Sequence, residues 1–229
     1  MPMEPLTDYL APFSLWLCVR RHYRDDGALS VEPAPVSNAL NTGPLMFVSR
    51  LHAHLYAALC NREQDCDGAH PWECMPLHAF GLREYGRTVG GRLDCELAYG
   101  FATDETGALA IAHGAPRVRV AELSFEIGDD MEEPTFSFNQ HAFEFMQTEW
   151  TGIGAPALLA TFDRVDALSD VALARTLDAA LLQARVTHTE PEVESGIDYW
   201  AVYDPGAARW VGAPGCVLGA VPRHSPTLH

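Results

Sequence analysis

The amino-acid sequence predicts an α+β fold in which an antiparallel or mixed sheet, a meander plus a C-terminal hairpin, packs with three or four helices. Several short segments alternate apolar and polar residues with a period of two, which is typical of strands, whereas longer segments repeat apolar residues every three or four positions, as helices do. Hydrophobic residues make up 48% of the 229 residues and charged residues 20%, as in globular chains. We expect a single α+β domain over 1–229, with 128–156 as the candidate for a weak boundary.

The first half of the chain contains two predicted strands and one helix. Residues 13–20 alternate, and Trp16 and Cys18 make the second face apolar too, so this strand is expected to be covered on both sides. Residues 45–49 form a short buried strand. Ser49 then caps a helix over 50–62, since its hydroxyl can accept a hydrogen bond from an amide of the first turn.

A hairpin is expected in the middle of the chain. Residues 92–103 and 108–113 flank a four-residue turn that ends in Gly107, a residue that takes positive φ without steric cost. Residues 116–127 add a third strand, which gives an antiparallel meander. The apolar phase shifts between Val120 and Leu123, so we expect a β-bulge there.

The second half alternates helices with short strands. Helices are predicted over 139–150 and 166–186, the second from a long apolar stripe with an acidic first turn. Residues 157–162 are predicted to be a short strand. A final hairpin joins 197–203 to 209–211.

The net charge of the chain limits the classes of molecule that it is expected to bind. The net charge is −16 and every basic residue is arginine. Such a surface repels nucleic acid and anionic membranes, and it attracts basic proteins. Nothing approaches 18 consecutive apolar residues, and the apolar stretch 13–19 lacks the flanks of a signal peptide, so we expect a cytoplasmic protein with six reduced cysteines.

One segment is rich in metal-ligand residue types. Its candidates are Cys60, Cys66, His70, Cys74 and His78. A tetrahedral zinc site needs four such ligands, but the spacing contains no C-x2-C pair, so no metal and no other cofactor is predicted. His52 and His54 lie two apart, which places them on different faces of a helix. A cysteine–histidine pair for nucleophilic catalysis, Cys74 with His78 or Cys95 with His141, stays open.

A second segment combines acidic and aromatic residues. Its candidate partner-binding residues are Glu126, Asp129, Asp130, Glu132, Glu133, Phe138 and Phe145. The acids would speed the encounter with a basic surface, and an exposed aromatic ring would anchor the complex. Phe143 and Phe145 cannot share one helical face, so one of them is expected to be exposed.

Residues 43–59 read GPLMFVSRLHAHLYAAL, a strand that leads into a helix with a leucine and alanine stripe. This segment resembles the opening of SseB-like proteins and of some bacterial toxin-immunity proteins. The resemblance implies an α+β binding domain without catalysis, and it carries over no site residues.

The chain has no G-x-S-x-G elbow and no P-loop. We therefore predict a non-catalytic, acidic protein-binding module, an immunity protein or inhibitor that neutralises a basic toxin or effector; the alternative is a small hydrolase or metal-dependent enzyme using the cysteines and histidines of 60–78. The partner's identity and the oligomeric state stay open.

Overall fold

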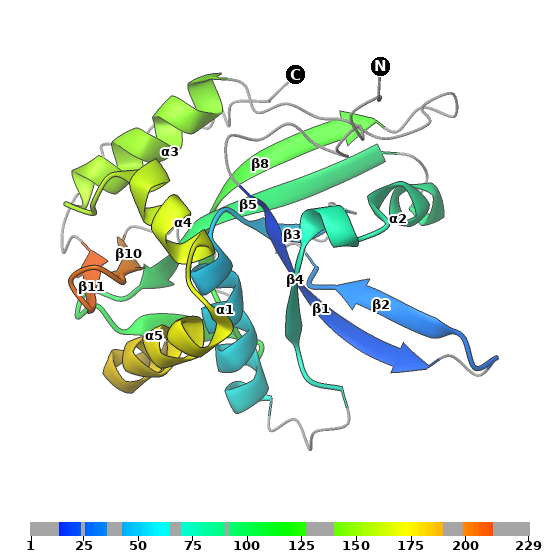
Figure 1. The fold of residues 1–229 in the computed structure, drawn as a ribbon, viewed down its shortest axis with the longest axis horizontal. Helices are drawn as coiled ribbons and strands as arrows, with labels where there is room; N and C mark the ends of the chain where they lie inside the picture. The colour runs from blue at the N-terminus through cyan, green and yellow to red at the C-terminus, as the bar shows by residue number, and fades with distance from the viewer. Residues whose placement is uncertain are drawn as a thin grey trace.

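A computed structural model describes residues 14–23, 26–35, 43–64, 70–89, 92–126, 140–189 and 199–212. These residues form a mixed sheet of eleven strands with five α-helices (Figure 1), which confirms the α+β class and adds one helix to the predicted count. The strands are β1 (Trp16–Tyr23), β2 (Leu29–Pro33), β3 (Leu45–Phe47), β4 (Glu73–Pro76), β5 (Arg92–Thr103), β6 (Leu109–Ala112), β7 (Ala115–Pro116), β8 (Val118–Glu126), β9 (Val186–His188), β10 (Tyr199–Asp204) and β11 (Arg209–Gly212). The helices are α1 (Arg50–Glu63), α2 (Leu82–Thr88), α3 (Gln140–Gly152), α4 (Leu158–Asp166) and α5 (Asp170–Gln183), with a 3-10 turn, η1 (Leu77–Ala79), before α2.

The strand order through the sheet is β11-β10-β5-β3-β1-β2. Strand β1 also pairs with β4, and β5 also pairs with β6 and β8. The predicted turn between β5 and β6 is present, with Gly107 at a φ of 78°. The meander order differs, however, because β8 pairs with β5 along almost its whole length, whereas β6 meets β5 only at Leu109 opposite Thr103. The positive φ of His113 and Gly114 turns the chain into β7, which pairs with β6 in place of β8.

The sheet carries a bulge, but in β5 rather than in β8. The register of β5 against β8 shifts between Ala98 and Gly100, whereas the register around Val120 is continuous. The extra residue, Tyr99, reverses the alternation of faces along β5. The apolar phase shift that suggested a bulge in β8 instead reflects a strand with apolar residues on both faces, since Val118, Val120 and Ala121 all pack against core residues.

Buried side chains gather in two clusters. The α1-side core joins α1 to the sheet and to α5, and includes Cys18, Phe47, Leu51, Leu55, Leu59, Phe101, Leu173, Ala180 and Tyr203. The α3-side core includes Leu17, Leu77, Leu82, Leu97, Tyr99, Met146, Trp150 and Trp200. Two neighbouring segments of β5 thus reach different cores: Tyr99, before the phase change, lies in the α3-side core, and Phe101, after it, lies in the α1-side core.

Two predicted elements near the end of the helical region are corrected. Residues 157–162, predicted as a strand, begin α4, in which Leu158, Phe162 and Val165 are buried at helical spacing. The predicted helix 166–186 is shorter, because the Ser169 hydroxyl accepts from Ala172 N and starts α5 at Asp170, and residues 186–188 are strand β9. By contrast, the predicted Ser49 cap of α1 is confirmed: its hydroxyl accepts from His52 N.

Candidate functional site

The predicted acidic–aromatic segment is only partly within the described residues. Asp129, Asp130, Glu132, Glu133 and Phe138 lie outside them, and Glu126 is the last residue of β8. Phe145 lies on α3 with 38% of its surface exposed, and its ring meets that of Tyr99 edge-on at 6.2 Å. Phe143 packs against the α3-side core. The expectation that one of these two rings is exposed is confirmed, whereas binding of a partner by Phe145 stays a prediction.

The described residues of the predicted metal-ligand segment come from three different elements. Cys60 is buried on α1 and Cys74 lies on β4, whereas His78 is exposed in η1. His70 contacts the carbonyl oxygen of Arg21 through Nδ1 at 3.0 Å. Cys66 lies outside the described residues, and among those that are described no three histidine, cysteine or acidic side chains come close enough to hold a metal ion.

The structure instead brings together two cysteines that lie far apart in the sequence, Cys18 and Cys74. Strands β1 and β4 place Cys18 directly opposite Cys74, and their sulfur atoms are 3.9 Å apart. The two residues are 56 positions apart in the chain, so their pairing depends on the register of β4 against β1, for which the sequence holds no local signal. Cys18 was expected to be a core cysteine, and it is fully buried; Cys74 is partly exposed.

We call Cys18 and Cys74 the thiol pair. Residues of helix α1 lie next to both members of the thiol pair. Cys18 Sγ lies 3.1 Å from the carbonyl oxygen of Ala53 and 3.9 Å from Cys74 Sγ, and its single thiol proton can be donated to either acceptor. The ring of His54, the next residue, lies 6.4 Å from that of Trp16, and His54 is close enough to Cys74 to stabilise its thiolate. His52 lies on another face, against Phe101 and Trp150, as the helical spacing predicted.

The two thiols differ in acidity because their surroundings differ. Burial raises the pKa of Cys18 well above its ordinary value. Hydrogen bonds from Cys18 and from His54 stabilise the thiolate of Cys74 and lower its pKa to about 6, although its partial burial acts in the opposite direction. The geometry therefore pairs a buried thiol, Cys18, with a partly exposed and more acidic one, Cys74.

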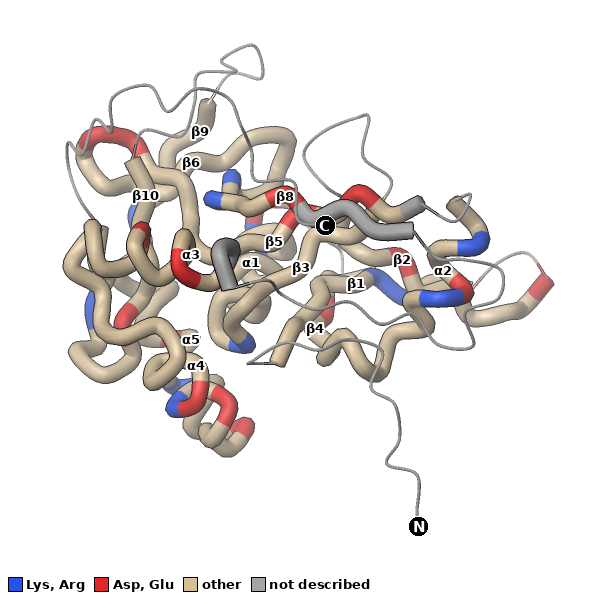
Figure 2. The backbone as a smooth tube through the Cα atoms, turned by 90° about the horizontal axis from the view of Figure 1, so that it is seen from above, with Lys and Arg blue, Asp and Glu red and all other residues tan. Residues whose placement is uncertain are grey.

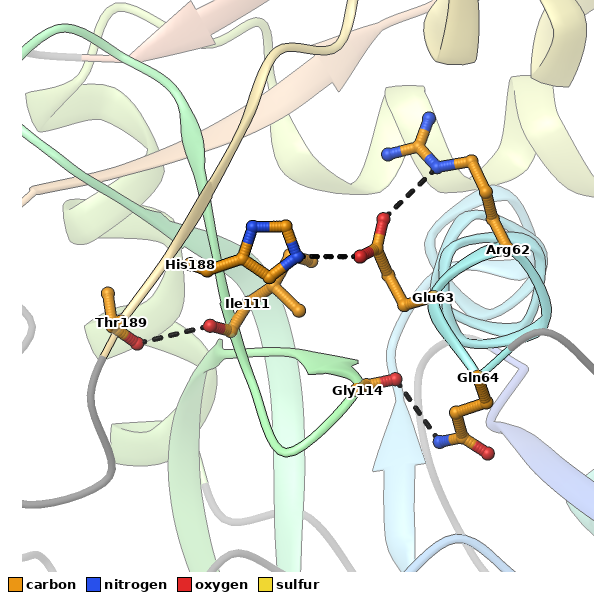
Figure 3. Close-up of polar contacts among 7 residues, drawn as sticks. All are labelled: Arg62, Glu63, Gln64, Ile111, Gly114, His188 and Thr189. Carbon is orange, nitrogen blue, oxygen red and sulfur yellow. Dashed lines mark hydrogen bonds and ion pairs between the residues drawn. The ribbon is translucent and has the colours of Figure 1, made fainter.

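A set of polar contacts fastens the other end of α1 to β6, β7 and β9 (Figure 3). His188 Nε2 lies 2.8 Å from Oε2 of Glu63, and the other carboxylate oxygen of Glu63, Oε1, accepts from Arg62 Nε. The side-chain amide of Gln64 donates to the carbonyl oxygen of Gly114 at 3.1 Å. The hydrogen bond from His188 lowers the pKa of Glu63. These contacts hold elements together, and both Arg62 and His188 are exposed, His188 with 70% of its side chain accessible.

No helix within the described ranges is long and apolar enough to cross a membrane. The chain was compared with protein-family models, with curated proteins and with solved structures, and none of the three comparisons finds a match. The resemblance of residues 43–59 to SseB-like and toxin-immunity proteins therefore stays a prediction.

Proposed function

We propose that this chain is a non-catalytic protein-binding module that neutralises a basic protein in the cytoplasm, as a bacterial immunity protein or inhibitor does. The observation that carries the proposal is the net charge of −16 over 229 residues. A surface of this sign accelerates association with a basic partner and disfavours nucleic acid and anionic lipid.

The placement of the described acids supports this proposal. Figure 2 shows acidic residues along β5 and β8 and on the helices of the other half of the molecule. Four acidic residues are exposed on separate elements: Glu122 on β8, Glu144 on α3, Asp163 on α4 and Asp178 on α5. Charges exposed in this way contribute little to folding stability, and their combined field attracts a basic partner.

Helix α3 offers the apolar contact that charge alone does not supply. The exposed ring of Phe145 directly follows the exposed carboxylate of Glu144, and α3 comes next in the chain after the predicted acidic segment. Electrostatic attraction mainly sets the association rate, whereas a buried aromatic anchor mainly sets the dissociation rate. We therefore propose that the partner docks on the predicted stretch from Glu126 to Trp150, with Phe145 as its anchor.

The test uses the polypeptide encoded by the gene next to that of this chain. Co-expression is expected to relieve growth arrest caused by that polypeptide, and the purified pair is expected to associate more slowly as salt increases. Changing Asp129 and Asp130 together to Arg is expected to slow association several-fold and leave the melting temperature unchanged. The matched control changes Asp163 and Asp178 to Arg, which reverses the same charge away from the predicted segment.

Separate outcomes contradict the separate parts of this proposal. If both double variants slow association equally, net charge matters but the predicted surface is wrong. Should Phe145→Ala destabilise the fold by several kcal/mol, as truncation of a buried phenylalanine does, its ring is part of the core and not an anchor. If the neighbouring polypeptide neither binds nor arrests growth, its neutralisation is not the function.

A second candidate function is an enzyme that uses the cysteines and histidines of residues 60–78. One observation favours it: Cys74 is an acidic thiol that hydrogen-bonds a histidine, although that histidine is His54 and not the predicted His78. A thiol hydrolase would lose ester hydrolysis in both Cys74→Ser and His54→Gln while retaining it in His78→Gln. Hydrolysis that survives in Cys74→Ser would exclude this role.

A further inference from the structure

The backbone pairing around Cys18 and Cys74 gives the two thiols the closest type of cross-strand position. Antiparallel pairs alternate between hydrogen-bonded and non-hydrogen-bonded positions, and side chains approach more closely at the latter. Leu77 N donates to Leu15 O, so the position opposite Leu15 is hydrogen-bonded, and counting along β1 makes Cys18 and Cys74 a non-hydrogen-bonded pair. The carbonyl oxygen of Cys18 confirms this, because it accepts from Ala34 N on the opposite side of β1.

This position suits a reversible disulfide. Cα atoms at a non-hydrogen-bonded pair are about 4.5 Å apart, inside the range of about 4.4–6.8 Å found across disulfides. The sulfur atoms, now 3.9 Å apart, would have to approach to about 2.05 Å. Cβ atoms at such pairs are usually farther apart than a relaxed disulfide prefers, and strained disulfides are the more readily reduced ones.

We propose that Cys74 is a site of oxidation by hydroperoxides and that Cys18 resolves the oxidised form into an intramolecular disulfide. In the first step the Cys74 thiolate attacks the outer oxygen of the hydroperoxide, the O–O bond breaks, and the alkoxide takes up a proton and leaves as an alcohol, or as water from hydrogen peroxide. Cys74 is then a sulfenic acid. In the second step Cys18 Sγ attacks Cys74 Sγ, the S–O bond breaks, and the Cys18 proton leaves with the hydroxide as water. The two sulfur atoms together lose two electrons, which reduce the peroxide.

The surroundings assign the two roles. Cys74 lies on β4 and is the more exposed of the two residues, and the neighbouring His54 favours its thiolate. Cys18 is fully buried and held by Ala53 O, so it is protected from peroxide but already faces Cys74. Cys95 is an internal comparison: it is also in a strand, but it is buried and burial raises its pKa.

The experiment treats the reduced full-length chain with one equivalent of hydrogen peroxide at pH 6 and blocks remaining thiols with an alkylating agent. Peptide mapping by mass spectrometry is expected to find Cys18 joined to Cys74 within the same chain. Cys74 is expected to be oxidised at least tenfold faster than Cys95, and addition of a dithiol should restore both thiols. The Cys95→Ser variant is the matched control, and it should oxidise as the wild type does.

The variants separate the two steps. In Cys18→Ser, whose hydroxyl can still donate to Ala53 O, the Cys74 sulfenic acid should persist and be trapped by a dimedone probe. In Cys74→Ser, no disulfide to Cys18 should form. The proposal is overturned if wild-type Cys74 reacts no faster than Cys95, if Cys74 joins Cys60, Cys66 or another chain in place of Cys18, or if Cys18→Ser traps no sulfenic acid.

Discussion

Protonation of His52 should make the stability of the fold depend on pH. His52 lies in the first turn of α1 with 2% of its surface exposed, between the rings of Phe101 and Trp150 at 5.5 and 6.0 Å. Its Nδ1 is buried and makes no hydrogen bond within the described part of the chain. Burial lowers its pKa from 6.5 to about 4, because the imidazolium would lose its hydration at this apolar site.

The sign and size of the effect follow from linkage. Because the folded pKa lies below the unfolded one, the unfolded chain binds more protons between these values, so the stabilisation is complete above pH 6.5 and decreases as pH falls toward 4. The lowering of the His52 pKa from 6.5 to about 4 corresponds to about 3.4 kcal/mol in all, of which about 2.5 kcal/mol is lost between pH 7.5 and pH 4.5. For a chain of this length that loss corresponds to roughly 5–10 °C in melting temperature.

The assay is urea unfolding of the wild type and of His52→Met at pH values from 7.5 to 4.5. Methionine removes the titrating ring and adapts to an irregular apolar site. The unfolding free energy of the wild type minus that of His52→Met should fall by about 2.5 kcal/mol from pH 7.5 to pH 4.5. The contributions of the other titrating groups cancel in this difference. The variant His78→Gln, which removes an exposed histidine, serves as the control for the loss of an imidazole ring. A difference that is constant with pH would refute the reasoning.

Three further predictions concern other contacts. Trp150→Phe should lose about 1–3 kcal/mol of unfolding free energy, because the Trp150 indole donates to the carbonyl oxygen of Tyr99 at the bulge. Trp210→Phe should lose less, because the Ala180 carbonyl oxygen that the Trp210 indole contacts also accepts a helical hydrogen bond from Ala184. Thermal unfolding of both variants makes the comparison. Glu63→Gln should cost under about 1 kcal/mol at pH 7, and its difference from the wild type should vanish as pH falls below 4.5 through the lowered pKa of Glu63, as followed by urea unfolding. Metal analysis of the purified protein should find no stoichiometric zinc, and about one zinc per chain that is lost in the Cys66→Ser, Cys74→Ser double variant would contradict this.

Elements with a complete local signal were predictable from the sequence. Ser49 before an apolar stripe predicts the start of α1, and the turn ending in Gly107 predicts the hairpin between β5 and β6, because these signals act within a few residues. The strand predicted over residues 157–162 was wrong for the opposite reason, because a short run of mostly apolar residues suits either a strand or a helix. The buried spacing of Leu158, Phe162 and Val165 becomes visible only when the window extends past the run.

The candidate site was less predictable than the fold. Cysteines and histidines close together in sequence were grouped, yet Cys18 and His54, which meet Cys74, come from a strand and a helix outside that segment. Strand register decides which side chains lie opposite one another, and a shift of one residue would have turned Cys74 to the other face. The exposed ring of Phe145 was predictable as one of two alternatives, because helical spacing alone separates it from Phe143.

The position of β10 beside β5 has a consequence during synthesis. Ala201 pairs with Phe101, and the Trp200 ring lies so close to Gly100 that a Cβ there would be 2.4 Å from Cε3. At ribosomal rates of about 5–20 residues per second, β10 is synthesised about 5–20 s after β5, and this edge of β5 stays unpaired during that time. During that interval the nascent chain exposes unpaired backbone and the flat site on Gly100 that Trp200 later covers. Premature termination before β10 would therefore leave a polypeptide that is prone to aggregate and dependent on chaperones, even though α1 to α5 have all been translated.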